Sequence, residues 1–149
     1  MPLQHGNAQG VAALICPGDV KPKNSRDDGS LDPPGFPSPN QNRDSVGTPI
    51  FNRTHILADR FYGEWRPENI FKGYRLMNVS GMKKCENRMA LYITKNQQPV
   101  LHFGRLQYTS GGVGTSGEMP GAIQMTATTP NGVLFNTPVN NANVKQVTC

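Results

Sequence analysis

The spacing of apolar residues changes once along the chain, and the change predicts one helix. Between Asn78 and Lys95 the apolar positions recur at helical spacing rather than alternating. The members of this stripe are Met82, Cys85, Met89 and Ile93, with charged and amide side chains between them. The sequence therefore predicts an amphipathic helix with one face on the core.

The ends of this helix carry residues that are typical of helix ends. Asn78 or Ser80 can cap its first turn, and Pro99 follows its last residue. Asn78, Met82 and Glu86 fall along one side of a regular helix. Because that side is mostly core, we expect Glu86 to be a partly buried carboxylate that needs a partner.

Elsewhere the pattern is extended. Strands are predicted at Gly10 to Cys16, Thr48 to Ala58, Val100 to Tyr108, Ala122 to Thr129 and Val133 to Thr137, with a short extended piece at Asn69 to Phe71. Pro130-Asn131-Gly132 is a strong hairpin signal between the last two strands. In the second strand, His55 has the opposite parity from Ile50 and Ile56 and so points to the other face.

Length and composition indicate a single domain. The chain has 149 residues with 16 Gly and 13 Pro, so short elements joined by generous loops are expected. Residues 1–9 and 141–149 are expected to be peripheral. No stretch resembles a signal peptide or is long enough to span a membrane, so we expect a soluble chain with no membrane partner. The lack of a clear start after Met1 suggests a domain excised from a longer polypeptide.

Residues 19–42 are dense in Pro, Gly, Asp and Asn and predict one long loop. A loop of this length in a compact domain is either functional or disordered, and we favour a functional loop. Phe36 is expected to anchor it to the core. Lys21, Lys23 and Arg26 would then form a basic rim.

The charge balance favours a polyanionic partner. The chain has 15 Lys and Arg against 10 Asp and Glu, a formal charge of +5 and a pI near 9.3. Nucleic acid is the obvious candidate, through long-range attraction and counterion release. Charge that only keeps the protein soluble is the alternative, and Lys83-Lys84 alone is most simply a solvated helix face.

The cysteines predict neither a zinc site nor a disulfide framework. Cys16, Cys85 and Cys149 are widely spaced and form no Cys-x-x-Cys motif. One pair could oxidise in a secreted protein.

Four residues together supply the groups that metal-assisted phosphodiester cleavage requires: Arg53, His55, Asn78 and Glu86. Such a reaction activates water, stabilises extra negative charge at phosphorus and helps an oxygen leave. Histidine can accept a proton near neutral pH, an Asn amide oxygen suits a partly hydrated Mg²⁺, and arginine binds phosphate oxygens. The arginines near these residues in the sequence are Arg53, Arg60, Arg66, Arg75 and Arg88.

Each of these residues also has a structural interpretation. A single His in a strand is more often a hydrogen-bonded structural residue than a base, and His5 and His102 are interpreted in this way. An Asn at a helix start is more often a cap. Glu86 alone would most simply form a salt bridge, for instance with Arg53 or Arg60.

Three segments carry a resemblance to a known family: Asn52 to Ala58, Glu68 to Ile70 and Asn78 to Asn87. Together they resemble the DNA/RNA non-specific endonuclease family of ββα-metal (His-Me finger) nucleases, in the bacterial branch of DNA-entry nucleases and polymorphic-toxin nucleases. The resemblance covers roughly Pro33 to Tyr108, with weaker agreement through Val139. Arg-x-His combined with Asn-x-x-Gly-Met-x-x-x-Glu is a fairly specific pattern.

The resemblance implies an α+β fold, with a ββα-metal core, a flanking antiparallel sheet and long loops. It implies that His55 is the general base and Asn78 the sole direct protein ligand of a hydrated Mg²⁺, for which Mn²⁺ could substitute. Glu86 would be a second or water-mediated metal contact, and Arg53 would contact phosphate. The expected nucleic-acid-binding residues are Arg53, Arg60, Arg88, Lys83 and Lys84.

The sequence departs from the family pattern in two places. The common Asp-Arg-Gly-His version reads Asn52-Arg53-Thr54-His55 here. Arg88 stands two residues after Glu86, where some members have a basic residue four after.

We therefore expect a Mg²⁺-dependent endonuclease for DNA, and for RNA as a further substrate, with little sequence preference. The expected setting is the toxin domain of a secreted bacterial effector that acts in the cytoplasm of a target cell and is blocked by an acidic immunity protein. An extracellular or surface nuclease for DNA uptake or scavenging is one alternative, which a Cys16–Cys149 disulfide would favour. A non-catalytic nucleic-acid-binding module is the other.

Overall fold

The computed structural model describes residues 1–22, 24–27 and 29–149. Its strands are β1 (Gly10–Ile15), β2 (Phe51–His55), β3 (Ile70–Tyr74), β4 (Val100–Gln107), β5 (Ala122–Thr129) and β6 (Gly132–Asn140). Its helical elements are η1 (Pro17–Asp19), η2 (Asp59–Phe61), η3 (Pro67–Asn69), the π-helical segment η4 (Met77–Met82) and α1 (Lys83–Asn96). Each predicted strand is present, and the short extended piece near Asn69 belongs to the five-residue strand β3.

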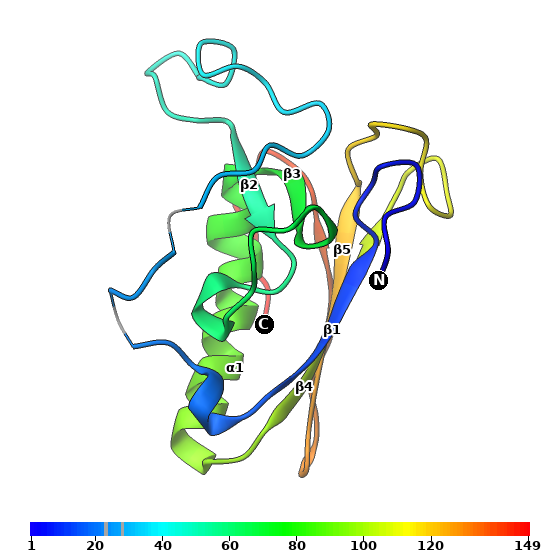
Figure 1. Ribbon diagram of the computed structural model, residues 1–149. Coiled ribbons are helices and arrows are strands. Elements are labelled where there is room, and N and C mark those ends of the chain that lie inside the picture. The colour runs from blue at the N-terminus through cyan, green and yellow to red at the C-terminus, as the bar shows by residue number, and fades with distance from the viewer. Residues whose placement is uncertain (23, 28) are drawn as a thin grey trace.

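The described strands form two antiparallel sheets (Figure 1). The larger sheet has the order β1-β4-β5-β6, and β2 pairs with β3 in the smaller one. Helix α1 forms a second layer beside the larger sheet, and the β2–β3 pair lies near the start of the helix. The fold is therefore α+β with antiparallel sheets, as predicted.

The core contains the predicted helix stripe. These residues are at most 1 % exposed, and they are Met82, Cys85, Met89 and Ile93. Alternate residues of β4 and β5 are buried in the same core, among them Val100, Ile123 and Met125. In the described part of the chain, no helix has both the length and the apolar character needed to cross a membrane.

Strand β2 is held in register by the residues on either side of His55. Thr54 and Ile56 are 0 % exposed, so the side chain of His55 points to the opposite face. Gly104 of β4 lies against Ile56, and a Cβ atom there would come within 2.6 Å of the Ile56 Cγ2 atom. Only glycine allows the end of β2 to pack this closely on the larger sheet.

His102 has the structural role predicted for it. The residue is 1 % exposed, and its Nδ1 atom lies 3.0 Å from the carbonyl oxygen of Thr126. A second hydrogen bond joins the imidazole to the backbone of Ile56. His102 therefore connects two strands of the larger sheet to the end of β2, while His5 is exposed near the N-terminus.

The helix begins earlier than predicted and with a different hydrogen-bond pattern. Helical backbone starts at Arg75, and within the π-helical segment the N–H of Lys83 donates to the carbonyl of Asn78. Asn78 therefore lies inside the helix and is not its cap. Ser80 is not a cap either, because its hydroxyl donates to the carbonyl of Leu76 one turn earlier.

Both chain ends, predicted to be peripheral, are bonded to the rest of the fold. Asn7 is 2 % exposed, and its amide donates to the carbonyl of Thr115 at 2.8 Å. Asn141 accepts a hydrogen bond from the N–H of Tyr74 at 2.9 Å and donates to the carbonyl of Lys72 at 3.1 Å. Few apolar residues near the chain ends suggested that these ends are peripheral. Hydrogen bonds from polar side chains attach both ends to the fold instead.

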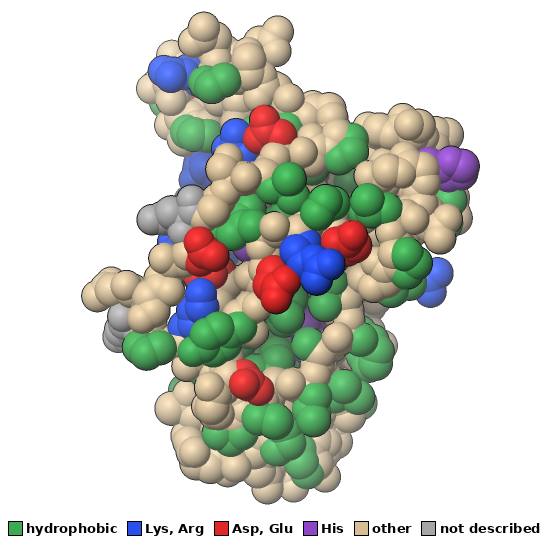
Figure 2. Space-filling view, viewed as in Figure 1, with side chains coloured by type: hydrophobic (Ala, Val, Ile, Leu, Met, Phe, Trp, Pro, Cys, Tyr) green, Lys and Arg blue, Asp and Glu red, His purple; other side chains and the backbone are tan. Residues whose placement is uncertain are grey.

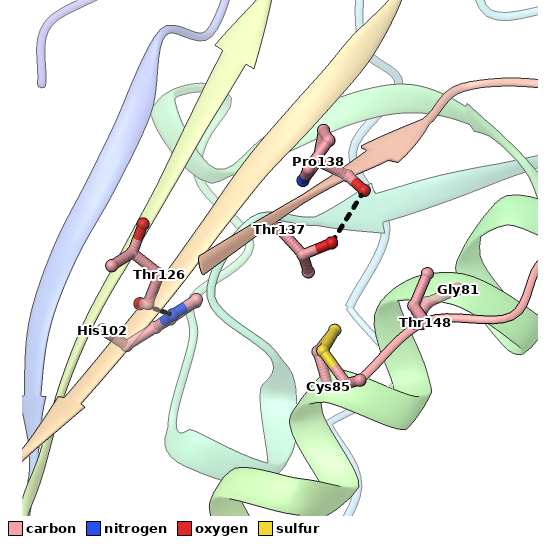
Figure 3. The surroundings of a disulfide bond; sticks show 8 residues. Gly81, Cys85, His102, Thr126, Thr137, Pro138 and Thr148 are labelled. Carbon is pink, nitrogen blue, oxygen red and sulfur yellow. Dashed lines mark hydrogen bonds between the residues drawn. A yellow bond between two sulfur atoms is a disulfide. The ribbon is translucent and has the colours of Figure 1, made fainter. Parts of the chain in front are cut away.

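A disulfide joins Cys85 of α1 to Cys149 (Figure 3). Cys16 is free. The pairing of Cys16 with Cys149 considered above is therefore wrong. The sequence separation is 64, and a closed loop of this length stabilises a fold by about 4 kcal/mol in the chain-entropy model.

Asn69 closes the loop between β2 and β3 directly behind His55. Its Oδ1 atom accepts a hydrogen bond from the N–H of Leu57 at 2.8 Å. Its Nδ2 atom donates to the carbonyls of Leu57 and Glu64, each at 3.0 Å. The side chain is buried, so no water can replace these bonds readily.

We expect Asn69→Ala to lower the free energy of unfolding by about 2–4 kcal/mol, because it removes three hydrogen bonds to part-buried backbone groups of Leu57 and Glu64. Urea unfolding followed by circular dichroism measures this loss. Gln107→Ala, on an exposed position of β4, is the matched control and should change stability by less than about 0.5 kcal/mol. Equal stability of the two variants would contradict the bracing role of Asn69.

Candidate functional site

A cavity of about 430 Å³ lies between the end of β2 and the start of the helix. Asn52 and His55 line it from β2, and Asn78 and Glu86 line it from the helical segment. The η2 turn and the first part of the long loop complete its wall. The fold thus brings together three residues that the sequence singled out: His55, Asn78 and Glu86.

The imidazole of His55 presents an unpaired nitrogen in this region. Its Nε2 atom is buried and has no hydrogen-bond partner among the described residues. A buried polar atom without a partner costs about 1–3 kcal/mol. Trp65 packs edge-on against the ring, with the two ring centroids 4.5 Å apart. An imidazole held in this way is available to bind a proton, water or another ligand.

Burial lowers the pKa of His55 below its ordinary value of 6.5. The negative charges of Asp59 and Asp27 act to raise it, and the positive charges of Arg26 and Lys21 act to lower it. Because the lowering prevails, His55 is neutral at neutral pH. That is the state in which an imidazole can act as a base.

The π-helical segment brings Asn78 and Glu86 to one cavity. In a regular α-helix, residues at this spacing would be rotated by about 80° from one another. A π turn contains more residues per turn, so each residue rotates by less and the offset shrinks. Met82 between them is wholly buried, as predicted for a member of the apolar stripe. Asn78 and Glu86 thus line the cavity beside the edge of that stripe.

Glu86 is a buried carboxylate, as predicted, with 8 % of its surface exposed. Burial raises the pKa of Glu86 to about 7, although the positive charges of Arg60 and Lys83 act to lower it. Arg53, considered above as a partner of Glu86, instead forms an ion pair with Asp32. Near neutral pH, a bound cation would therefore compete with a proton for this carboxylate.

Asp59 fastens the long loop to the cavity. Its Oδ1 atom lies 2.9 Å from Nζ of Lys21, and its Oδ2 atom accepts a hydrogen bond from the N–H of Asp27 at 3.2 Å. The indole of Trp65 donates to the carbonyl of Asp27 at 3.1 Å. One carboxylate and one indole thus hold the loop against the cavity.

The long loop provides part of the expected basic rim, but Phe36 does not anchor it in the core. Lys21 and Arg26 line the cavity, and Lys23 lies outside the described residues. Phe36 is half-buried, and its ring centroid lies 4.5 Å from the guanidinium carbon of Arg53. The loop crosses the outer face of β2, where it meets a cation rather than an apolar surface.

Arg53 lies in a second, adjoining cavity of about 630 Å³, which His55, Trp65 and Asn78 also line. Its Nε atom is 2.5 Å from Oδ1 of Asp32, an exposed residue of the long loop. A phosphate group that enters this cavity would compete with the Asp32 carboxylate for the guanidinium. Arg53 is therefore near the candidate base but is not free in this structure.

The other predicted cations fall into two groups. Arg60 and Lys83 line the first cavity, and Arg60 donates a hydrogen bond to the side chain of Asn87. Lys84 and Arg88 are exposed on α1 and do not belong to the described wall of that cavity. On the face shown in Figure 2, Lys and Arg side chains are interspersed with Asp and Glu rather than gathered in one patch. Of the predicted nucleic-acid-binding residues, Arg60 and Lys83 thus belong to the described wall of the first cavity, and Arg53 belongs to that of the second.

Trp65 and Asp59 are site residues that the sequence analysis did not identify. Trp65 is the single Trp of the chain and follows Arg-x-His within the same loop, which is a weak signal at most. Asp59 lies four residues after His55 and resembles any turn carboxylate. Neither residue belongs to an apolar pattern, and their roles depend on Asp27, which approaches only in the folded chain.

The donors in the first cavity fit a hard, partly hydrated cation. Asn78 offers an amide oxygen and Glu86 a carboxylate, and oxygen donors are those that Mg²⁺ prefers. The described residues contain no group of three or more His, Cys, Asp and Glu side chains arranged to hold a metal. Mg²⁺ commonly keeps several waters and needs only one or two protein ligands. Asn78 and Glu86 could therefore hold it.

The fold is shared with solved nuclease structures. The chain superposes on NucA from Streptococcus agalactiae with magnesium bound, with a TM-score of 0.73 and 15 % identity. The match covers 97 % of this chain and 69 % of the NucA chain. For the same protein without metal the TM-score is 0.70. The Sda1 nuclease with bound zinc gives a TM-score of 0.70 and 19 % identity over 95 % of this chain and 74 % of that one. Neither a family model nor a curated protein matches the sequence.

We expect His55 to titrate with a midpoint below 6.5, because burial disfavours its charged form. Nuclear magnetic resonance of the imidazole C–H groups during a pH titration measures the midpoint, with His55→Gln identifying the resonance. Titration at 6.5 or above would show that the ring is solvated or paired with an anion.

We expect Glu86→Gln to stabilise the metal-free fold more at pH 8 than at pH 4.5. Because the folded pKa of about 7 lies above the ordinary 4.5, the native state holds the proton more tightly, and wild-type stability falls as pH rises through this window. The difference at pH 8 should be on the order of 1–3 kcal/mol. Urea unfolding in a chelator at both pH values measures it, and a difference that does not change with pH would contradict the raised pKa.

Proposed function

We propose that this chain is a metal-dependent endonuclease that hydrolyses phosphodiester bonds without base specificity. The observation that carries the proposal is the unpaired, buried Nε2 atom of His55 in a cavity that Asn78 and Glu86 also line. The fold shared with NucA and Sda1 supports it, since both are described as nucleases. On this proposal the β2–β3 pair and α1 form a ββα-metal core.

In the proposed reaction, His55 accepts a proton from the water that attacks phosphorus. Its lowered pKa keeps it neutral for this task. Asn78, with Glu86 directly or through water, would hold a Mg²⁺ ion, with Mn²⁺ as a substitute. When bound, such an ion supplies positive charge to the phosphate and the leaving oxygen. Arg53 would add charge from the second cavity once a phosphate replaces Asp32.

The proposed substrate is DNA, with RNA as a second one. Arg60 and Lys83 provide charge in the first cavity, and Lys84 and Arg88 would contact more distant phosphates. Contacts to the backbone position a nucleic acid without reading its sequence. A lack of base preference is therefore the outcome that these residue types support.

The disulfide favours one of the two settings considered for such an enzyme. A Cys85–Cys149 bond persists in an oxidising compartment and is reduced in most cytoplasms. This supports an extracellular or surface nuclease over an effector that acts in a target-cell cytoplasm. An acidic immunity protein would be the partner in the effector setting, because acidic groups would complement Lys21, Arg60 and Lys83 in the cavity.

A non-catalytic nucleic-acid-binding module fits the site less well. Such a module needs surface cations, but it does not need a buried histidine with an unpaired nitrogen beside a buried carboxylate. Both features oppose stability, and costs of this kind are typical of functional sites.

We expect purified protein with Mg²⁺ to nick supercoiled plasmid, and excess EDTA to abolish the activity. His55→Ala should lower the rate by about 100- to 10,000-fold, which is the usual contribution of a general base. Asn78→Ala should lower it at least as much, because it removes a direct metal ligand. Gel densitometry of nicked and linear plasmid measures the rates.

His5→Ala is the matched control, because His5 is exposed and is not among the residues that line either cavity, and it should retain wild-type activity. Cleavage by the His55 and Asn78 variants at the wild-type rate would exclude the proposed roles. Plasmid and RNA left intact by the folded wild type would exclude the activity.

A further inference from the structure

The last residues of the chain lie beside the π-helical segment η4, and Figure 3 shows Thr148 next to Gly81 of that segment. The backbone N–H of Gln146 donates to the hydroxyl oxygen of Ser80 at 2.9 Å. The hydroxyl of Thr148 donates to the carbonyl of Gly81 at 2.7 Å. The tail therefore bonds to two consecutive residues of the π-helical segment, which lie two and three residues after Asn78.

The disulfide attaches the end of this tail beside Glu86. Cys149 bonds to Cys85, the residue before Glu86. The tail is thus attached at Ser80, Gly81 and Cys85, which all lie between Asn78 and Glu86 in the sequence. Its other end is held by Asn140, whose carbonyl accepts a hydrogen bond from the side chain of Gln146.

The π segment is a conformation that needs external contacts. Regular α-helical hydrogen bonds are the usual outcome for a helix, and π turns are rare. Here the hydroxyl of Ser80 donates to the carbonyl of Leu76 while it accepts the Gln146 N–H, so one side chain joins the helix to the tail. Gly81 is packed tightly as well, since a Cβ atom there would lie 2.6 Å from Cγ1 of Val139.

We propose that the disulfide-closed tail, residues 146–149, is a positioning clamp that keeps the start of the helix in its π register and so holds Asn78 and Glu86 together around the cation. The inference rests on the proposed metal site, and it adds a redox requirement to it. In the α register, Asn78 and Glu86 would be offset by about 80° around the helix axis, which would move their oxygen donors further apart.

The clamp makes the site sensitive to thiols. A dithiol reductant attacks the sulfur of Cys149, which is an exposed residue, and the S–S bond breaks. Two electrons and two protons pass to Cys85 and Cys149, and the reductant is oxidised to its own disulfide. The freed tail then holds Ser80 and Gly81 only through single hydrogen bonds that water can replace. The enzyme would be competent in an oxidising compartment and weakened in a reducing one.

The test measures Mn²⁺ binding by electron paramagnetic resonance, with plasmid nicking in parallel. Oxidised wild-type protein is compared with wild-type protein that has been reduced by a phosphine and then desalted without air. The phosphine is oxidised in this step to its oxide, with oxygen taken from water. We expect reduction to raise the Mn²⁺ dissociation constant at least about tenfold, equivalent to about 1.4 kcal/mol, while circular dichroism shows the fold intact. Cys85→Ser with Cys149→Ser should match the reduced protein, and Cys16→Ser should match the oxidised one.

A variant that keeps the disulfide makes the test independent of stability. Thr148→Val removes the bond to Gly81, and we expect it to weaken Mn²⁺ binding about two- to threefold in the oxidised protein. Thr137→Val is the matched control, because its hydroxyl bonds only to the neighbouring Pro138 carbonyl in the described contacts (Figure 3), and it should bind Mn²⁺ as the wild type does.

The outcomes separate the clamp from the proposed function. Equal Mn²⁺ affinity of oxidised and folded reduced protein would overturn the clamp and leave the nuclease intact. If the reduced protein unfolds, wild-type affinity in Thr148→Val would overturn it. Oxidised wild type that neither binds Mn²⁺ nor nicks plasmid would overturn the proposed function and the clamp with it.

Discussion

The burial of Thr54 and Ile56 on both sides of His55 is the constraint on which the candidate site depends. Side chains alternate along a strand, so a shift of one residue would bury His55 and expose its neighbours. Ile56 lies against Gly104, and His102 bonds to the Ile56 backbone. These contacts with β4 of the larger sheet fix which residues of β2 face the core. The direction of the imidazole is therefore a consequence of core packing.

Opposite this strand, the fold accepts unfavourable features that a purely structural helix would avoid. The π-helical start leaves the usual α register, Glu86 is a buried carboxylate with a pKa raised to about 7, and His55 has an unpaired nitrogen. Each opposes stability, and all of them border one cavity. The disulfide and the closely packed apolar stripe of α1 stabilise the fold and offset these unfavourable free energies. Strained features persist at functional sites when the surrounding structure stabilises them in this way.

Segments without regular structure complete the site. The long loop is bound through Asp59 and Trp65, and the C-terminal tail is bound through Ser80 and Cys85. Polar side chains attach both segments, and one covalent bond also attaches the tail. Such attachments leave no periodic pattern in a sequence. For this reason the tail was predicted to be peripheral, and the apolar residue Phe36 was expected to anchor the long loop to the core.

The sequence by itself determined the elements that follow apolar spacing, namely the buried stripe of α1 and the alternating strands, because burial of one face requires that spacing. It also proposed His55, Asn78 and Glu86 as candidates, since few residue types can supply a base and hard oxygen donors, and these three line one cavity. Only the tertiary structure decided the π register, the partner of Cys149 and the position of Trp65 beside the imidazole. Those depend on contacts between distant residues, which local spacing does not encode.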